Sequence, residues 1–74
     1  MMTKRFALGF KGVAGDDLDH RVLDAIRVAH GHVDACGTHL PTQWRDIDCT
    51  IPKLAAPEFV GEMQRLGVEI EEMS

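Results

Sequence analysis

The chain of 74 residues predicts a two-layer α+β domain, a four-stranded antiparallel sheet with two helices on one face. Two kinds of pattern support this. Four stretches alternate between apolar and polar residues with the period of two that is typical of half-buried strands, and two stretches repeat apolar residues with helical spacing. The order of these stretches is β-α-β-β-α-β, which is that of a ferredoxin-like split βαβ sandwich, and residues 1–74 are expected to form a single domain.

The clearest strand is expected at Trp44 to Pro52, where proline ends the stretch because it cannot donate to a sheet. One predicted face carries Arg45, Ile47, Cys49 and Ile51, and the other carries Trp44, Asp46, Asp48 and Thr50. A second strand is expected within residues 4–13, with Phe6, Leu8 and Phe10 on the core face and Arg5, Ala7, Gly9 and Lys11 on the other.

The first helix is predicted to begin at Asp16, a good N-cap residue, and to run to about His30, with Gly31 as the left-handed residue that ends it. The second helix is predicted to open at Pro57 and to close at Gly67.

The two remaining strands are shorter. Residues 32–38 predict an edge strand, with Val33 and Ala35 toward the core and His32, Asp34 and Cys36 facing out, and residues 68–71 predict the last strand. In the expected sheet the strands lie in the spatial order fourth, first, third, second. The order of elements resembles that of small-molecule-sensing regulatory domains of the ACT kind, and this resemblance in pattern implies a ligand-sensing role as an alternative function.

Twelve apolar side chains are expected in the core: Phe6, Leu8, Phe10, Leu18, Val22, Ile26, Ile47, Ile51, Phe59, Met63, Leu66 and Ile70. The two cysteines, Cys36 and Cys49, are predicted to remain unbonded because the expected hairpin directs them to opposite faces of the sheet.

The composition of the chain disfavours some functions and indicates an expected location. The net charge of −4 and the pI near 5.4 disfavour direct binding to nucleic acid or to an anionic membrane. Two cysteines in so short a chain without a signal-peptide pattern favour a reducing compartment, so a cytoplasmic location is expected. A domain this small has little core, which makes a protein partner or a homodimer a useful source of stability.

The predicted face opposite the helices contains the candidate partner-binding residues Trp44, Asp46, Asp48, Asp34, Glu69 and Glu71. The hairpin expected between the second and third strands places Asp34 directly opposite Asp48, a repulsive arrangement unless something neutralises it. A basic partner surface would do so externally, with Trp44 as a contact anchor. The alternative is a solvated face on which Arg5 and Lys11 neutralise the carboxylates internally.

The sequence contains few residues in patterns that could support catalysis, so no enzymatic activity or cofactor is expected. The turn GVAGDD lacks the lysine and the spacing of a phosphate-binding loop, and Cys36 with His39 is a weak nucleophile–base signal. A second alternative is zinc or copper binding, because the chain offers the ligand types His30, His32, Cys36, His39 and Cys49, although their spacing matches no standard site.

The leading prediction is therefore a small acidic, non-catalytic protein-interaction or regulatory module. This class includes inhibitors that present a carboxylate-rich sheet face to a basic, nucleic-acid-binding protein. Ligand sensing and metal binding remain as the two alternatives.

Overall fold

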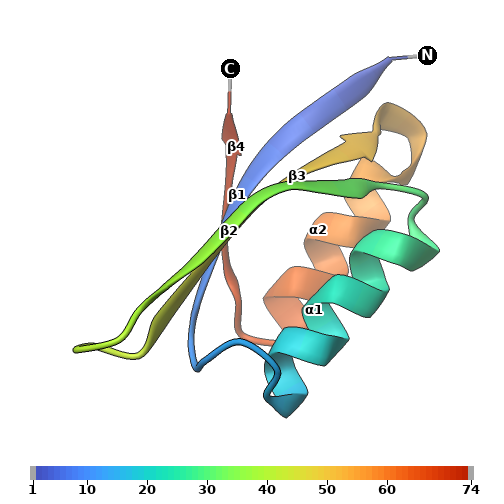
Figure 1. The fold of residues 1–74 in the computed structure, drawn as a ribbon. Helices are drawn as coiled ribbons and strands as arrows, with labels where there is room; N and C mark the ends of the chain where they lie inside the picture. The colour runs from blue at the N-terminus through green and yellow to red at the C-terminus, as the bar shows by residue number, and fades with distance from the viewer. Residues whose placement is uncertain (1, 74) are drawn as a thin grey trace.

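The computed structural model describes residues 2–73 and confirms the ferredoxin-like fold. The elements in chain order are β1 (Thr3–Lys11), α1 (Asp17–Val28), β2 (His32–His39), β3 (Trp44–Pro52), the 3₁₀ turn η1 (Lys53–Ala55), α2 (Ala56–Arg65) and β4 (Glu69–Met73). The four strands form one antiparallel sheet in the order β2-β3-β1-β4. Both helices cover one face of this sheet, and we call the opposite, uncovered face the open face (Figure 1).

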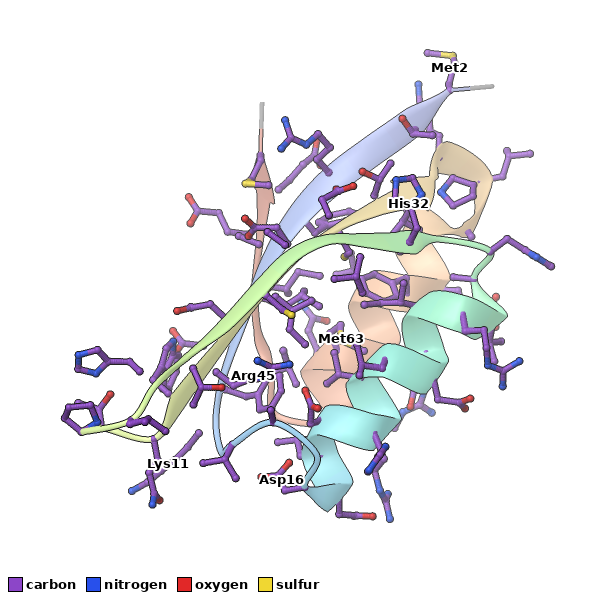
Figure 2. The ribbon with its side chains drawn as sticks, viewed as in Figure 1. Met2, Lys11, Asp16, His32, Arg45 and Met63 are labelled. Carbon is purple, nitrogen blue, oxygen red and sulfur yellow. The ribbon has the colours of Figure 1, made fainter. Side chains whose placement is uncertain are left out.

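The core lies between the sheet and the helices, where Figure 2 shows Met63. Nine of the twelve predicted core side chains are buried, and Leu18, Leu66 and Ile70 are instead half-buried at the margins of the layer. The core also buries Cys49, Ala56 and Val68. The Phe6 ring from β1 packs against the Phe59 ring from α2 with centroids 5.9 Å apart, which joins the two layers.

The start of α1 follows the prediction, whereas its end does not. Asp16 caps the helix by accepting hydrogen bonds from the Asp19 and Val13 amides, and these bonds lower the pKa of its carboxyl group. The left-handed residue after α1 is His30, with φ 60°, and not Gly31. Gly31 has a different role, because a Cβ there would lie 2.5 Å from the Ile51 side chain. At the end of α2, Gly67 adopts φ 78° as expected.

The predicted register of the β2–β3 hairpin is wrong by one residue over most of its length. His32 lies opposite Thr50 as expected, but a β-bulge at Asp34 shifts the following pairs, so that Ala35 faces Asp48. Ala35 therefore lies on the open face, and Cys36, opposite Ile47, lies on the helix side. Because of the bulge, Asp34 is no longer directly opposite Asp48, the position in which two like charges repel most strongly.

Both cysteines are free thiols, but the argument from opposite faces was wrong, since Cys36 and Cys49 lie on the same side of the sheet. Cys36 is exposed and Cys49 is buried. Burial, followed by the nearby charges of Asp34 and Asp48, raises the pKa of the Cys49 thiol to about 12.

Neither helix in residues 2–73 has the length and apolar character that crossing a membrane requires.

Candidate functional site

The open face carries two parallel rows of side chains that cross β3, β1 and β4. The first row is Asp46, Gly9 and Glu69, and the second is Asp48, Ala7 and Glu71. In each row a carboxylate on either side flanks a residue with almost no side chain. Strand spacing puts the flanking positions about 10 Å apart across the sheet and about 7 Å apart along each strand. Four predicted site residues, Asp46, Asp48, Glu69 and Glu71, therefore lie together around a flat floor.

Trp44, the only tryptophan, is half-buried and leans over Gly9. A Cβ at position 9 would lie 2.8 Å from Trp44 Cζ2 and 3.0 Å from its Nε1, so the indole occupies the space that a side chain would need. Gly9 is consequently buried although it lies on the open face. A larger residue at position 9 would displace the ring.

A shallow hollow lies between the indole and β4. It is lined by Ala7, Leu8, Gly9, Trp44, Asp46, Glu69, Ile70 and Glu71. The indole and Asp46 form its wall on the β3 side, Glu69 and Glu71 form its wall on the β4 side, and the small residues of β1 form its floor. Five of the six residues of the two rows line the hollow together with Trp44. Aromatic surface and negative charge therefore occur at the same place.

The carboxylates around this hollow form no ion pair with a cation among residues 2–73. In the described part, residues 2–73, no ion pair within 4.0 Å involves Asp46, Glu69 or Glu71. The two cations of the open face lie outside the rows, because Arg5 is opposite Thr50 and Met73, and Lys11 is opposite Trp44. Direct internal neutralisation, the alternative raised by the sequence, is absent among these residues.

Asp34, the sixth predicted site residue, belongs to a separate cluster at the β2 edge. Its carboxylate accepts a 2.6 Å hydrogen bond from the Thr50 hydroxyl and lies 3.0 Å from His32 Nε2. The bulge thus gives Asp34 partners of its own and leaves it out of the two rows.

An ion pair behind the open face was not predicted. Arg45 is 7% exposed and its Nε donates to Asp19 Oδ1 at 2.9 Å, where Asp19 is 3% exposed. Figure 2 shows Arg45 directed from β3 toward the first turns of α1. Burial alone would lower the pKa of Arg45, but the hydrogen bond and charge of Asp19 outweigh burial and raise it. The signal in the sequence was an arginine on the otherwise apolar, core-facing side of the strand, because a buried arginine is rarely found without a paired acid.

This ion pair fixes the strand position next to Trp44. Asp19 Oδ2 also accepts from the Gly15 amide at 2.9 Å, and Arg45 Nη1 donates to Thr38 Oγ1 at 3.1 Å. These bonds join the loop before α1, the helix and the β2–β3 hairpin. The start of β3, which bears Trp44, is therefore held on its helix side by hydrogen bonds that link Gly15, Asp19, Arg45 and Thr38.

The proposed metal ligands do not assemble. Residues 2–73 contain no group of three or more His, Cys, Asp or Glu side chains that could hold a metal ion. His39 Nδ1 lies 2.8 Å from the Thr42 hydroxyl in the hairpin turn, and His32 lies beside Asp34. The Cys49 thiol is buried in the core.

A second hollow of about 400 Å³ lies between α1 and α2 on the outer side of the helical layer. Its apolar lining comes from Ala25, Val28, Ala29, Ala55, Phe59 and Leu66. Its rim mixes acidic and basic residues, including Arg21, Asp24, Glu58 and Glu62. No single charge sign distinguishes this hollow, in contrast to the one beside Trp44.

Comparison with known proteins adds evidence for the fold. No protein-family model and no curated protein matches the chain. Among solved structures, the chain is similar to formyltetrahydrofolate deformylase from Burkholderia mallei ATCC 23344, with a TM-score of 0.68 and 12% identity over 99% of this chain. The match covers 28% of the deformylase chain, so the present chain spans little more than a quarter of that enzyme's length. At this identity the likeness shows the fold alone.

Proposed function

We propose that this chain is a non-catalytic protein-interaction or regulatory module that binds a basic protein surface through the open face of its sheet. The observation that carries the proposal is the pair of carboxylate rows, Asp46–Gly9–Glu69 and Asp48–Ala7–Glu71, beside Trp44. Tryptophan is enriched among residues that dominate binding energy, and clustered charge of one sign accelerates encounter with a partner of the opposite sign.

The open face suits docking for a second reason. Strand backbone is held by the sheet, and the floor residues Ala7 and Gly9 project little above it. A partner therefore meets a preorganised surface with few side chains to immobilise, which lowers the entropic cost of association.

Within this class, a nucleic-acid-binding protein is the partner whose charge fits the face best. Such proteins bear clustered Lys and Arg that contact phosphates, and a carboxylate-rich face competes for the same groups. A chain that occupies this surface would act as an inhibitor of nucleic-acid binding. The two free thiols agree with a cytoplasmic site of action.

The test uses affinity capture from the native cell with the wild-type chain and two variants of equal charge change. One carries Glu69→Gln with Glu71→Gln on the open face, and the control carries Glu58→Gln with Glu62→Gln on α2. We expect basic proteins to be retained by the wild type and the control, to elute as salt rises, and to be lost from the open-face variant. Hydrogen exchange of the purified complex should then show protection in β1, β3 and β4. Protection confined to the helices would reject the proposal.

Ligand sensing is a second candidate, because the order of elements resembles that of regulatory domains of the ACT kind. The deformylase contains this fold as 28% of its chain, so the fold occurs there as one part of a larger enzyme. The turn between β1 and α1 is a poor ligand site, however, because the Gly12, Val13 and Gly15 amides already donate to Gln43, Asp16 and Asp19. A small ligand at another position would be detected as a rise in melting temperature on adding candidate metabolites.

A further inference from the structure

We propose that the hollow beside Trp44 receives an arginine side chain of the protein partner, with its guanidinium against the indole and its N–H groups directed at the flanking carboxylates. This inference rests on the proposed function and specifies the contact at its centre. It follows from three features of the hollow: an aromatic wall, a floor of small residues, and carboxylates on both sides.

The aromatic wall is held in place from below. The indole edge formed by Nε1, Cε2 and Cζ2 lies closest to Gly9, at 2.8 to 3.1 Å from the position that a Cβ would take. The neighbouring Arg45 is anchored in the opposite direction by Asp19. The ring is therefore positioned before any partner arrives, and one side of it borders the hollow.

The floor admits a flat group between the ring and β4. Gly9 and Ala7 are the only side-chain positions of β1 in the hollow that point to the open face. Side chains of ordinary size at these two positions would fill the space between Trp44 and Glu69. The indole itself covers Gly9, and the small Ala7 side chain leaves the space between the ring and β4 open to a planar group.

The charges select a cation with several donors. Asp46 stands on the Trp44 side of the hollow, and Glu69 and Glu71 stand on the β4 side. An ammonium group is a compact charge with no plane to place against a ring. A guanidinium presents a plane for stacking and five N–H donors around its edge, so it can contact the indole and carboxylates on two sides together.

The experiment uses two defined probes at low salt, the peptides acetyl-(Gly-Arg)₃-amide and acetyl-(Gly-Lys)₃-amide, which carry equal charge. Binding is followed by the ¹H–¹⁵N resonances of the Trp44 indole and of the Gly9 amide. We expect the arginine peptide to shift both resonances and to bind about two- to fivefold more tightly than the lysine peptide, as expected for a cation–aromatic contact at a partly exposed site.

Three variants separate the contributions. Trp44→Leu removes the ring and should abolish the preference for arginine while leaving weak binding of both peptides. Gly9→Ala keeps the ring but displaces it, and should reduce the preference for arginine. This variant tests the same contact if Trp44→Leu does not fold. Glu69→Gln with Glu71→Gln should weaken both peptides, whereas Glu58→Gln with Glu62→Gln should weaken neither by more than the change in net charge.

Equal affinity for the two peptides in the wild type would overturn the arginine inference, and the proposed function would stand if Glu69→Gln with Glu71→Gln still weakened both. The arginine inference would also be overturned if neither peptide bound, or if the shifted resonances all belonged to residues away from Gly9 and Trp44. The other possible occupant of the hollow is a second copy of the chain, which sedimentation would detect as a dimer. We expect a monomer, and a dimer that buries Trp44 would overturn the arginine inference.

Discussion

Replacing Asp19 by asparagine removes the negative charge that compensates the buried Arg45 guanidinium. Asparagine has nearly the same shape but only one acceptor oxygen, whereas Asp19 uses one oxygen for the Gly15 amide and the other for Arg45 Nε, so the variant removes the negative charge together with one of these hydrogen bonds. Removing one partner of a buried ion pair costs about 3–5 kcal/mol, because the remaining charge is left without compensation. At about 0.05–0.15 kcal/mol per residue, a chain of 74 residues has a free energy of unfolding of about 4–11 kcal/mol. We expect the variant to lose a large share of this stability.

The assay is urea unfolding followed by the fluorescence of Trp44, the only tryptophan and the neighbour of Arg45 in β3. Asp17→Asn is the matched control, because Asp17 lies in the same helical turn but pairs with Arg21 on the surface, at 3.0 Å. Exposed pairs contribute about 0–1 kcal/mol, so the control should unfold almost as the wild type does. The double variant Asp19→Leu with Arg45→Met should be more stable than Asp19→Asn alone, since it buries no unpaired charge. A loss below about 1 kcal/mol for Asp19→Asn would show that water reaches Arg45 in solution, and would refute the reasoning.

Burial and charge lead to four further predictions. Ile47→Ala should lower the free energy of unfolding by about 2–5 kcal/mol, since Ile47 is completely buried, and a melting temperature within a degree or two of the wild type would contradict its place in the core. Thiol titration of the native protein at pH 8 should find Cys36 alone, and both thiols after denaturation. Because folding raises the pKa of Cys49, its contribution to stability is complete below the unfolded pKa and is lost as pH rises toward about 12; a Cys49→Ala variant should show a smaller decline in stability between pH 9 and pH 11. Asp46→Asn with Asp48→Asn should leave the free energy of unfolding within about 0.5 kcal/mol and weaken partner binding, whereas unfolding with unchanged binding per folded molecule would identify these carboxylates as structural.

The strands whose side chains alternate most regularly were the easiest to predict. The boundaries of β3 were predicted to the residue, because Trp44 to Pro52 alternates without exception and proline stops it. Its partner β1 was predicted two residues too long at its C-terminal end, where Gly12 turns the chain. These two strands lie at the centre of the sheet, where one face must be buried and the alternation is strictly constrained.

The edge strand β2 shows why the rest could not be predicted. All but one of its residues are exposed, so no buried face constrains its register, and a bulge costs little there. The end of α1 was missed for a similar reason: His30 takes the left-handed conformation that glycine usually adopts, while Gly31 is required by contact with Ile51, a residue twenty positions later. Such contacts depend on tertiary structure and leave no local pattern.

The bulge at Asp34 also changes the argument about charge on the open face. With regular pairing, Asp34 would face Asp48, and one of the two carboxylates would have to be neutralised for the sheet to be stable. The bulge instead pairs Asp48 with Ala35 and gives Asp34 the Thr50 hydroxyl as a donor. The carboxylate nearest the sheet edge thus has partners of its own, whereas in residues 2–73 no ion pair within 4.0 Å involves the carboxylates of the two central rows. On β1, Arg5 and Lys11 occupy the open-face positions on either side of Ala7 and Gly9, so they lie diagonal to the carboxylates of the rows and not directly opposite them. Binding of an external cation to these rows is therefore part of the proposal, and it would supply the directly opposed positive charge that the sheet does not place there.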